Sequence, residues 1–425
     1  MRVAYGSAIL SLSLTSVVAC AQNLGRRVEG AAGNAVQFSY ASRPGVCGDG
    51  RSYMRTDADS WYGTINDMTR ATPCEAGPIR LVVIKSGAEV IKLEAYAGPL
   101  TPAADATDLG RVSAADAVAY LASLARTAEG RVARDALLPL GLADSANVSP
   151  VLLEITRDPA RSRELRRSAL SWLVRRRGAA DAMPTADLLT LVTRVAKDDN
   201  EHSAFRQSAV GQLGRFDRGE GIPALVELSS ASADPWLARQ ATEVLARSGD
   251  PRARRAVRTL AESPDAPAEA RAAAIAGMGA EYGTAQDAEA LVRAYPKLST
   301  DKLQDAALGA IAAVGGNPAR TFLLSVVRDE AGMARQRRRA AGLLDRSGVA
   351  VREVIKVYDQ VSDGEVRGTL IDLLAQAGTR EATAKLLAIA KEDTQPNARR
   401  RAINALGKTD DPSVRAALRG LVGPG

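Results

Sequence analysis

Aromatic residues are scarce in this chain, where phenylalanine, tyrosine and tryptophan make up only 4% of the 425 residues. Hydrophobic residues still account for 46%, so the apolar material is mainly Ala, Leu and Val. Such small and medium side chains suit closely packed helices, whereas a β-rich chain would carry more aromatic and β-branched residues. The length also exceeds the usual size of one compact core. We therefore expect a mainly helical chain with several domains or an elongated array of repeats.

Potential metal ligands and long charged blocks are also lacking. The chain has one histidine, His202, and two cysteines without a nearby histidine do not make a zinc site. We expect His202 to lie exposed at a helix start and predict no metal and no cofactor. The 56 basic and 49 acidic residues are interspersed, so the net charge of +7 is not gathered into a polyphosphate-binding tail. Nucleic-acid binding is therefore not indicated.

The first residues predict export. Met1 and Arg2 give a short positive start, residues 4–19 are apolar and uncharged, and Ala19-Cys20-Ala21 fits the small-x-small pattern of a cleavage site. A signal peptide over residues 1–21 is the natural interpretation, but residues 17–20 also fit a bacterial lipobox in which Cys20 is lipidated. The apolar run is shorter than the roughly 20 residues that a spanning helix needs. We expect a periplasmic protein or an outer-membrane-tethered lipoprotein, with a lipid as its only membrane contact.

Residues 22–99 differ in composition from the rest and predict a small β-containing domain. Gly, Pro, Ser, Asp and Tyr cluster there between short apolar runs, and strands are expected at residues 35–40, 79–85 and 89–96. The last two flank Ser86-Gly87-Ala88, a link typical of a β-hairpin. Tyr53, Trp61 and Tyr62 would form either a recognition patch or, as we prefer, the core. Residues 100–115 are expected to be a linker.

Cysteine usage agrees with export. Once Cys20 has been removed or lipidated, Cys47 and Cys74 are the two cysteines that remain. Two thiols in an oxidising compartment usually pair, so we predict a disulfide between them. A bridge that closes a loop of this size would contribute about 3 kcal/mol to a domain with little core.

A repeat fills the chain from residue 116 to residue 425. The unit is Arg-x-x-Ala-aliphatic-x-x-Leu-Gly, and its central anchors are Ala136, Ala169, Ala209, Ala241, Ala274, Ala307, Ala340, Leu370 and Ala402. An aliphatic residue follows each anchor four positions later, which places both on one helix face. The anchors are 30 to 40 residues apart, enough for two short helices and two turns. Nine helical hairpins are therefore predicted, each stacking its apolar face on its neighbours.

The turns after the anchor helices strengthen this prediction, because Asp or Asn with Pro follows them at residues 250–251, 317–318 and 411–412. The anchor helix, this turn and a second apolar helix resemble HEAT repeats, and most closely the short HEAT-like repeat first noted in phycobilisome lyases. Departures are few: Ala238 and Gln304 stand in place of Arg, and Leu370 replaces Ala. The resemblance implies an α-α superhelix, a curved solenoid whose concave surface binds protein, and it implies no chemistry.

Charged residues in the array offer candidates for binding rather than catalysis. Asp198, Asp199 and Glu201, and likewise Asp410 and Asp411, fall at turns where solvated caps are expected. The arginine runs at residues 175–177, 335–339 and 399–401 would form solvated helix faces or, alternatively, grip phosphate or an acidic partner. By analogy with HEAT arrays, we expect Arg252, Arg255 and Arg258 of one second helix to line the concave surface. Asp287 and Glu289 would interrupt any basic stripe.

These observations favour a scaffold or adaptor of the cell envelope that binds a protein of unknown identity and catalyses nothing. A variant of this hypothesis makes the N-terminal β domain the binding module and the solenoid a rigid arm. Two alternatives remain open. One is a bilin lyase-like or other enzyme, suggested only by the resemblance, and the other is a solenoid that binds nucleic acid, which would predict a basic concave stripe and strong salt dependence.

Overall fold

The computed structural model describes residues 23–57, 60–63, 74–100, 103–144, 146–279, 283–408 and 412–422. The chain forms two compact units, unit 1 (residues 1–216) and unit 2 (residues 217–425). The expected signal peptide, with the candidate lipidation site Cys20, lies outside the described residues. Within the described ranges, no helix combines the length and the apolar character needed to span a bilayer.

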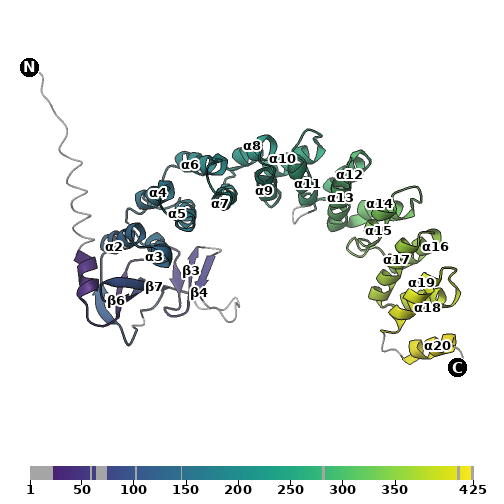
Figure 1. Ribbon diagram of the computed structural model, residues 1–425, viewed down its shortest axis with the longest axis horizontal. Helices are drawn as coiled ribbons and strands as arrows, with labels where there is room; N and C mark the ends of the chain where they lie inside the picture. Colours follow the sequence, from purple (N-terminus) through teal and green to yellow (C-terminus); the bar gives the residue numbers. More distant parts are fainter. Residues whose placement is uncertain are drawn as a thin grey trace, which may run out of the picture. The chain divides into compact units, whose positions relative to one another are not determined.

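Pairs of helices follow one another from Ala114 onward (Figure 1). The anchor helices, which carry the repeated anchors, are α3 (Gly130–Leu142), α5 (Arg163–Arg175), α7 (Ser203–Leu213), α9 (Pro235–Ala246), α11 (Ala268–Gly277), α13 (Asp301–Val314), α15 (Ala334–Ala341), α17 (Gly364–Ala377) and α19 (Pro396–Leu406). The leading helices, which alternate with them, are α2 (Ala114–Thr127), α4 (Ser149–Arg157), α6 (Thr185–Lys197), α8 (Ile222–Ala231), α10 (Pro251–Glu262), α12 (Ala285–Ala294), α14 (Gly316–Arg328), α16 (Val351–Gln360), α18 (Arg380–Glu392) and α20 (Pro412–Val422). A 3-10 turn, η1 (Tyr295–Lys297), follows α12.

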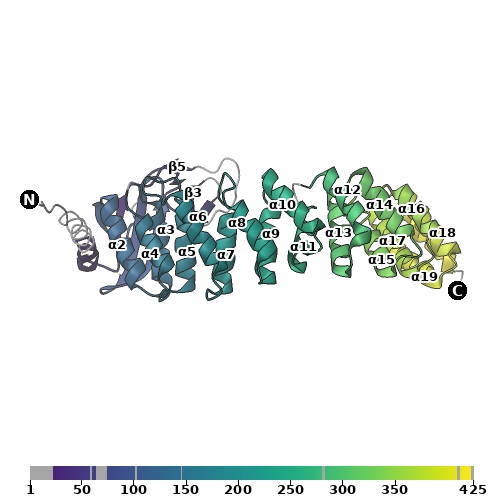
Figure 2. The same cartoon turned by 90° about the horizontal axis from the view of Figure 1, so that it is seen from above.

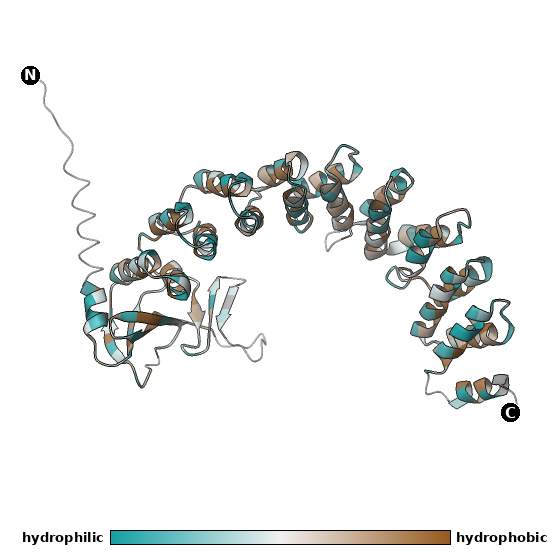
Figure 3. Ribbon diagram, viewed as in Figure 1, coloured by the Kyte–Doolittle hydropathy of each residue, from teal (hydrophilic) through white to brown (hydrophobic). Residues whose placement is uncertain are grey.

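The repeated anchors form the interior, as the pattern predicts. Each of the nine anchor side chains, all of them within the described residues, is 0% exposed. The aliphatic residues four positions later are at most 3% exposed. Apolar and polar positions therefore occupy opposite sides of the helices, which Figure 3 shows as brown and teal sides. Burial between neighbouring repeats is the source of stability in such arrays.

Within each unit the helices stand side by side in two rows, one of anchor helices and one of leading helices (Figure 2). In unit 2, α9 packs on α11 and α11 on α13, while α10 packs on α8, and α12 on α14. Most anchor helices pack most closely on the leading helix before them. Figure 1 shows α9, α11, α13 and α15 on the inner side of unit 2.

The arginine of the repeat caps the leading helix of its own pair. Its Nε donates to the carbonyl ten residues earlier, as in Arg166 to Thr156 (3.1 Å), Arg206 to Ala196 (3.2 Å), Arg271 to Ala261 (3.1 Å) and Arg337 to Val327 (3.2 Å). Each acceptor is the penultimate residue of its helix. The last carbonyls of a helix lack partners and carry partial negative charge, so a guanidinium satisfies both needs. The repeated arginine is therefore a structural residue.

The β region of unit 1 has two sheets. The first has the order β7 (Glu89–Ala97), β6 (Ile79–Ser86), β1 (Ala35–Tyr40) and β8 (Thr107–Arg111). The predicted strand at residues 35–40 and the predicted hairpin are present, and a two-residue turn with Gly87 at φ 60° joins β6 to β7. β8 runs parallel to β1, so the expected linker at residues 100–115 contains a strand. The pattern missed β8 because it is a largely exposed edge strand without alternating apolar residues.

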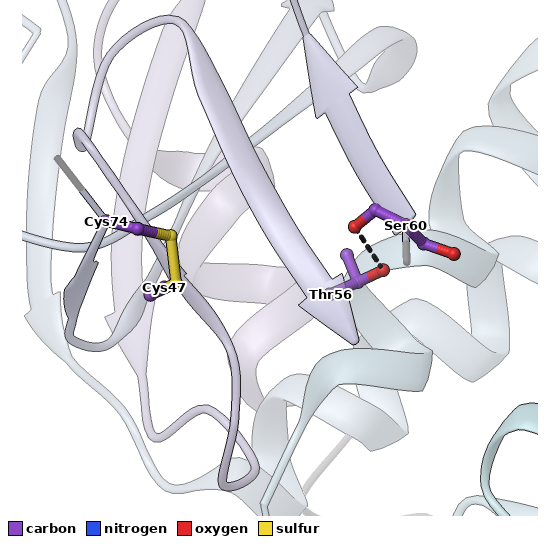
Figure 4. Close-up of a disulfide and its surroundings, with 4 residues drawn as sticks. All are labelled: Cys47, Thr56, Ser60 and Cys74. Atoms are coloured by element: carbon purple, nitrogen blue, oxygen red, sulfur yellow. Dashed lines mark hydrogen bonds between the residues drawn. A yellow bond between two sulfur atoms is a disulfide. The ribbon is translucent and has the colours of Figure 1, made fainter. Parts of the chain in front are cut away.

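The second sheet has the order β4 (Ser60–Gly63), β3 (Tyr53–Asp57), β2 (Cys47–Gly48) and β5 (Glu75–Ala76). A disulfide joins Cys47 to Cys74, tying β2 to the residue before β5 (Figure 4). Thr56 Oγ1 donates to the carbonyl of Ser60, 3.4 Å away, where β3 turns into β4. Tyr53 and Tyr62 are half-buried, so neither sits in the fully buried core that we preferred for them. The side chain of Trp61 lies outside the described part of the structure.

The β region and the first helices share one core, so residues 22–99 are not a domain apart. Tyr40 Oη donates to the carbonyl of Pro139 in α3 at 2.8 Å, and the Phe38 ring meets Tyr120 of α2 edge to face at 6.0 Å. Ser42 forms a β-bridge with Ala143. Residues 23–30 are helical and bury Leu24 and Val28. The repeat pattern did not predict this contact. The pattern marks the residues buried between neighbouring helices, and the β region packs on a different face of the first helices.

Candidate functional site

Each anchor helix has one face that does not pack on the other helices of the array, and we call it the outward face. Two positions define this face, and they follow the anchor by two and by six residues. In α3 these positions are Leu138 and Leu142, and Leu142 is 0% exposed. The carbonyl of Leu142 accepts a hydrogen bond from the Arg43 amide at 2.8 Å. The outward face of α3 is thus covered by the chain's own β region.

In unit 2 the outward faces of α9, α11 and α13 form an open depression of about 360 Å³, which we call the anchor groove. Its floor consists of small side chains, namely Ala272, Ala273, Ala276, Gly277 and Ala306. A Cβ added at Gly277 would lie 2.4 Å from the Cβ of Ala246, so the glycine lets α11 approach α9 closely. Small residues on both helices leave room for another backbone to lie against them.

Charged side chains form the walls of the anchor groove. Arg239 and Arg247 of α9 line one side and Lys302 of α13 the other. Arg239 Nε lies 2.8 Å from Glu243, and Lys302 Nζ lies 2.5 Å from Glu269. The hydrogen bond from Lys302 lowers the pKa of Glu269, which keeps this carboxylate charged. The groove therefore offers charged walls around an apolar floor.

One large apolar side chain lies on the same stripe of α9. Trp236 is 37% exposed and precedes Arg239 by three residues and Gln240 by four, which places all three on one helix face. Exposed Trp and Arg are the residue types that most often carry binding energy at protein interfaces. The sequence analysis did not single out Trp236, the groove floor or Arg247, and aligning the repeats by their anchors is the signal that finds the last two.

The three arginines expected to line the concave surface lie elsewhere. Arg252, Arg255 and Arg258 belong to α10, a leading helix on the outer side of unit 2 in Figure 1. Arg252 Nη2 donates to the carbonyl of Arg218 at 2.6 Å, and Arg258 Nε lies 2.6 Å from Asp287. Hydrophobic periodicity does not say which helix of a hairpin lies on the inner side, and this is why the expectation differs from the structure.

Asp287 holds a buried cluster rather than interrupting a basic stripe. Its side chain is 0% exposed, pairs with Arg254 and Arg258, and accepts from the amide of Thr284 at 2.9 Å. Burial raises the pKa of Asp287, but hydrogen bonds from Arg258 and Thr284 and the charge of Arg254 outweigh it, so the pKa lies below its ordinary value. Asp287 therefore links α10 to α12 as a structural anion.

The arginine runs are largely engaged within the protein. Arg337, 3% exposed, caps α14 and pairs with Glu330 at 2.6 Å. Its neighbour Arg335 reaches both Asp301 and Asp305 at 2.6 Å. In the first run, Arg176 is 3% exposed, and in the last run Arg401 pairs with Asp372. The expectation of solvated faces is therefore wrong for Arg176 and Arg337, because their carbonyl and carboxylate partners lie inside the array.

The acidic turn before α7 is likewise structural. Asp198 accepts from the amide of Asn200 at 3.0 Å, as a cap does, but Glu201 pairs with Arg166 and its side chain is only 16% exposed. His202 is exposed and caps α7 by accepting from the Ala204 amide at 3.2 Å. No group of three or more His, Cys, Asp or Glu side chains suited to a metal occurs among the described residues. Asp410 and Asp411 lie outside those residues.

Unit 1 has a larger groove, of about 1100 Å³, between residues 23–30, α2 and the β6–β7 turn. Two of its charged groups are engaged by the surrounding chain: Lys85 Nζ donates to the carbonyls of Glu29 and Ala31, and Arg126 pairs with Glu154. The hydroxyl of Tyr120 is buried and has no hydrogen-bond partner among the residues that the structure describes, and burial raises its pKa. Volume alone favours this groove, but the anchor groove combines exposed cations with a floor of small apolar side chains, so we prefer the anchor groove.

Two-row packing of short helical hairpins, with a recurring arginine cap, defines the class as an α-solenoid. Residues 188–279 and 351–423 match the family model of HEAT repeats. These two stretches of the chain are HEAT repeats.

A search of curated proteins found no match to this sequence. Among solved structures, human deoxyhypusine hydroxylase in complex with glycerol is similar at 18% identity, with a TM-score of 0.26 and coverage of 61% of this chain and 94% of that one. The complex of CpcE and CpcF of phycocyanin lyase from Nostoc gives 17%, 0.29, 60% and 92% for the same quantities. Importin beta gives 14%, 0.39, 69% and 44%. Likeness of this size carries no information on function.

Proposed function

We propose that this chain is an exported, non-catalytic scaffold of the cell envelope that holds a protein partner against the anchor groove of unit 2. One contrast carries the proposal. The outward face of α3 has large apolar residues and is covered by the chain's own strands, whereas the same face of α11 and α13 has small apolar residues and is open. Side chains that are apolar yet solvent-facing on adjacent helices favour a partner that approaches closely.

The rim of the groove supports the same proposal. Specific interfaces combine an apolar centre with a polar rim, and aromatic and arginine side chains are enriched in them. Here Ala272, Ala276 and Ala306 form the centre, while Arg239 and Lys302 stand at the rim. Trp236 supplies an exposed aromatic group on the same helix face as Arg239.

Photo-cross-linking in cells tests the groove. A photoreactive phenylalanine analogue at Ala276 should give a discrete cross-link to one protein, because this position lies on the groove floor. The matched control is the same analogue at Thr259, an exposed residue of the leading helix α10. Equal cross-links at both positions, or cross-links to nucleic acid alone at Ala276, would overturn the proposal.

Export is tested separately by the mass of the N-terminus in chain recovered from the envelope fraction. Cleavage after Ala21 predicts an unmodified chain that begins at Gln22, and processing before Cys20 predicts a chain that carries acyl groups on that cysteine. A chain that keeps Met1 and stays in the cytosol would contradict export.

A further inference from the structure

The anchor groove has a definite charge preference, which identifies the chemistry of its partner. We propose that it takes an extended, acidic polypeptide segment in which carboxylates flank a run of small side chains. This inference rests on the proposed function, because it names the class of segment that the scaffold holds.

Four acids on this face are already paired with cations of the protein, while two cations are not paired. Glu243 and Glu269 pair with Arg239 and Lys302, and both Asp301 and Asp305 pair with Arg335. Arg247 lines the groove, and its guanidinium has no hydrogen-bond or ion-pair partner in the part of the chain that the structure describes. Arg339 of α15 is equally without a partner among the described residues, and its Nη2 lies 3.9 Å from the point where a Cβ on Gly309 would stand. Two uncommitted arginines thus bracket α11 and α13.

Among the paired groups, the cationic side chains are more exposed than their acidic partners, which also favours an acidic ligand. The Arg239 side chain is 52% exposed against 28% for Glu243, and Lys302 is 61% exposed against 35% for Glu269. An approaching partner therefore meets the cations first. Exposed ion pairs contribute little stability, so these cations can exchange their partners for carboxylates of a ligand at small cost.

The floor sets the size of the side chains that fit. Between the two arginines lie Ala276 of α11 and Gly309 and Ala313 of α13 at the outward positions. Helices in a row are about 9 Å apart, and an extended chain rises about 3.3 Å per residue, so the three steps from α9 to α15 correspond to about eight residues. The segment should therefore have Gly, Ala or Ser over this length and Asp or Glu at both ends.

Fluorescence anisotropy with the mature full chain tests this inference. The probe is the labelled peptide Glu-Glu-Gly-Ala-Ser-Gly-Ala-Ser-Glu-Glu, and the matched peptides replace Glu by Lys or the central residues by Leu. We expect the acidic peptide to bind at least ten times more tightly than either matched peptide, and more weakly as salt rises. Equal affinity for the three peptides, or tighter binding of a DNA duplex of similar length at the same site, would overturn the inference.

Charge-reversal variants localise the binding. Arg247→Glu with Arg339→Glu should weaken the acidic peptide at least tenfold. The control, Arg255→Glu with Arg293→Glu, makes the same change in net charge on exposed residues of leading helices and should change affinity less than twofold. Equal losses in both variants would overturn the inference. A protein that cross-links at Ala276 but is not displaced by the acidic peptide would leave the scaffold proposal standing and refute its acidic chemistry.

Discussion

The outward face of an anchor helix is closed at α3 in unit 1 and open at α9, α11 and α13 in unit 2, although both units have the same kind of interior. In α3 the two outward positions are Leu138 and Leu142, and the β region lies on them. In α9 the equivalent residues are Glu243 and Arg247, beside the open groove. Two positions in each repeat therefore decide whether its face packs or stays available, without any change to the buried anchors.

A substitution at one of these outward positions should have the largest effect on stability. Leu142→Arg places an unpaired charge in a site with 0% exposure, and we expect it to destabilise unit 1 by at least about 4 kcal/mol. Urea unfolding with limited proteolysis should show early digestion of the β region. The reverse exchange, Arg247→Leu, changes an exposed residue and should alter stability by about 0.5 kcal/mol or less. Similar losses in both variants would show that the two faces do not differ.

In the buried interior, Asp287→Ala should lower the free energy of unfolding by about 3 to 5 kcal/mol, because two arginines then lose the buried carboxylate between them. The pKa of Asp287 lies below its ordinary value, so its contribution is present above about pH 4 and is lost as the pH falls through the folded-state pKa. Urea unfolding at pH 7 and pH 3 should therefore show a gap between wild type and variant that narrows in acid.

Asp181 provides the equivalent test in unit 1. Burial raises the pKa of Asp181, but hydrogen bonds from the Ser149 amide and from Arg176 lower it by more, so the net shift is downward. Acid should therefore weaken both units. For either aspartate, the difference in unfolding free energy between the wild type and the alanine variant should shrink from pH 7 to pH 3. A difference that stays constant would contradict the assignment of a charged structural role.

Removing the disulfide should lower the stability of unit 1 but not that of unit 2. Cys47→Ser with Cys74→Ser opens a loop of 27 residues and should cost unit 1 about 3 kcal/mol on the chain-entropy estimate. Thermal unfolding followed by proteolysis should show the loss in the β region and leave unit 2 unchanged. An equal shift in unit 2 would mean that the units do not unfold separately.

The smallest effect on stability should come from filling the anchor groove. Ala276→Leu adds an exposed side chain and should change the free energy of unfolding by less than about 1 kcal/mol. It should nevertheless abolish binding of the acidic peptide, because the branched leucine side chain would occupy the floor of the groove. Ala384→Leu on α18, also exposed, is the control and should leave binding intact. Retained binding in Ala276→Leu would place the ligand elsewhere.

The interior was predictable from the sequence because burial repeats with the helix period. Ala274 and Met278, for example, recur in register with Ala307 and Ile311, and all four are buried. The strand at residues 35–40 was predictable from its apolar character and its turn-rich flanks. β8 was not, because backbone pairing with β1 rather than side-chain burial holds an edge strand such as Thr107–Arg111.

The candidate site was much less predictable. Ala276 and Gly309 look like ordinary helix positions, and their outward placement emerges only when the repeats are aligned by their anchors. Arg252, Arg255 and Arg258 stood out as a cluster of charge, but most of that charge is used on Asp250 and Asp287. Charge clusters in such a sequence record internal pairing as often as they record a binding surface, and a single chain does not tell the two apart.

The arginine cap makes each repeat that carries it a self-contained cassette. Arg271 and its acceptor Ala261 lie in the same helix pair, as do Arg337 and Val327, so the signal that stops a leading helix travels with the repeat. Duplicating or excising one such pair would therefore keep its cap with it and change only the junctions. Evolution can lengthen or shorten such an array by unequal recombination, and a protein engineer can set the length of its groove in the same steps.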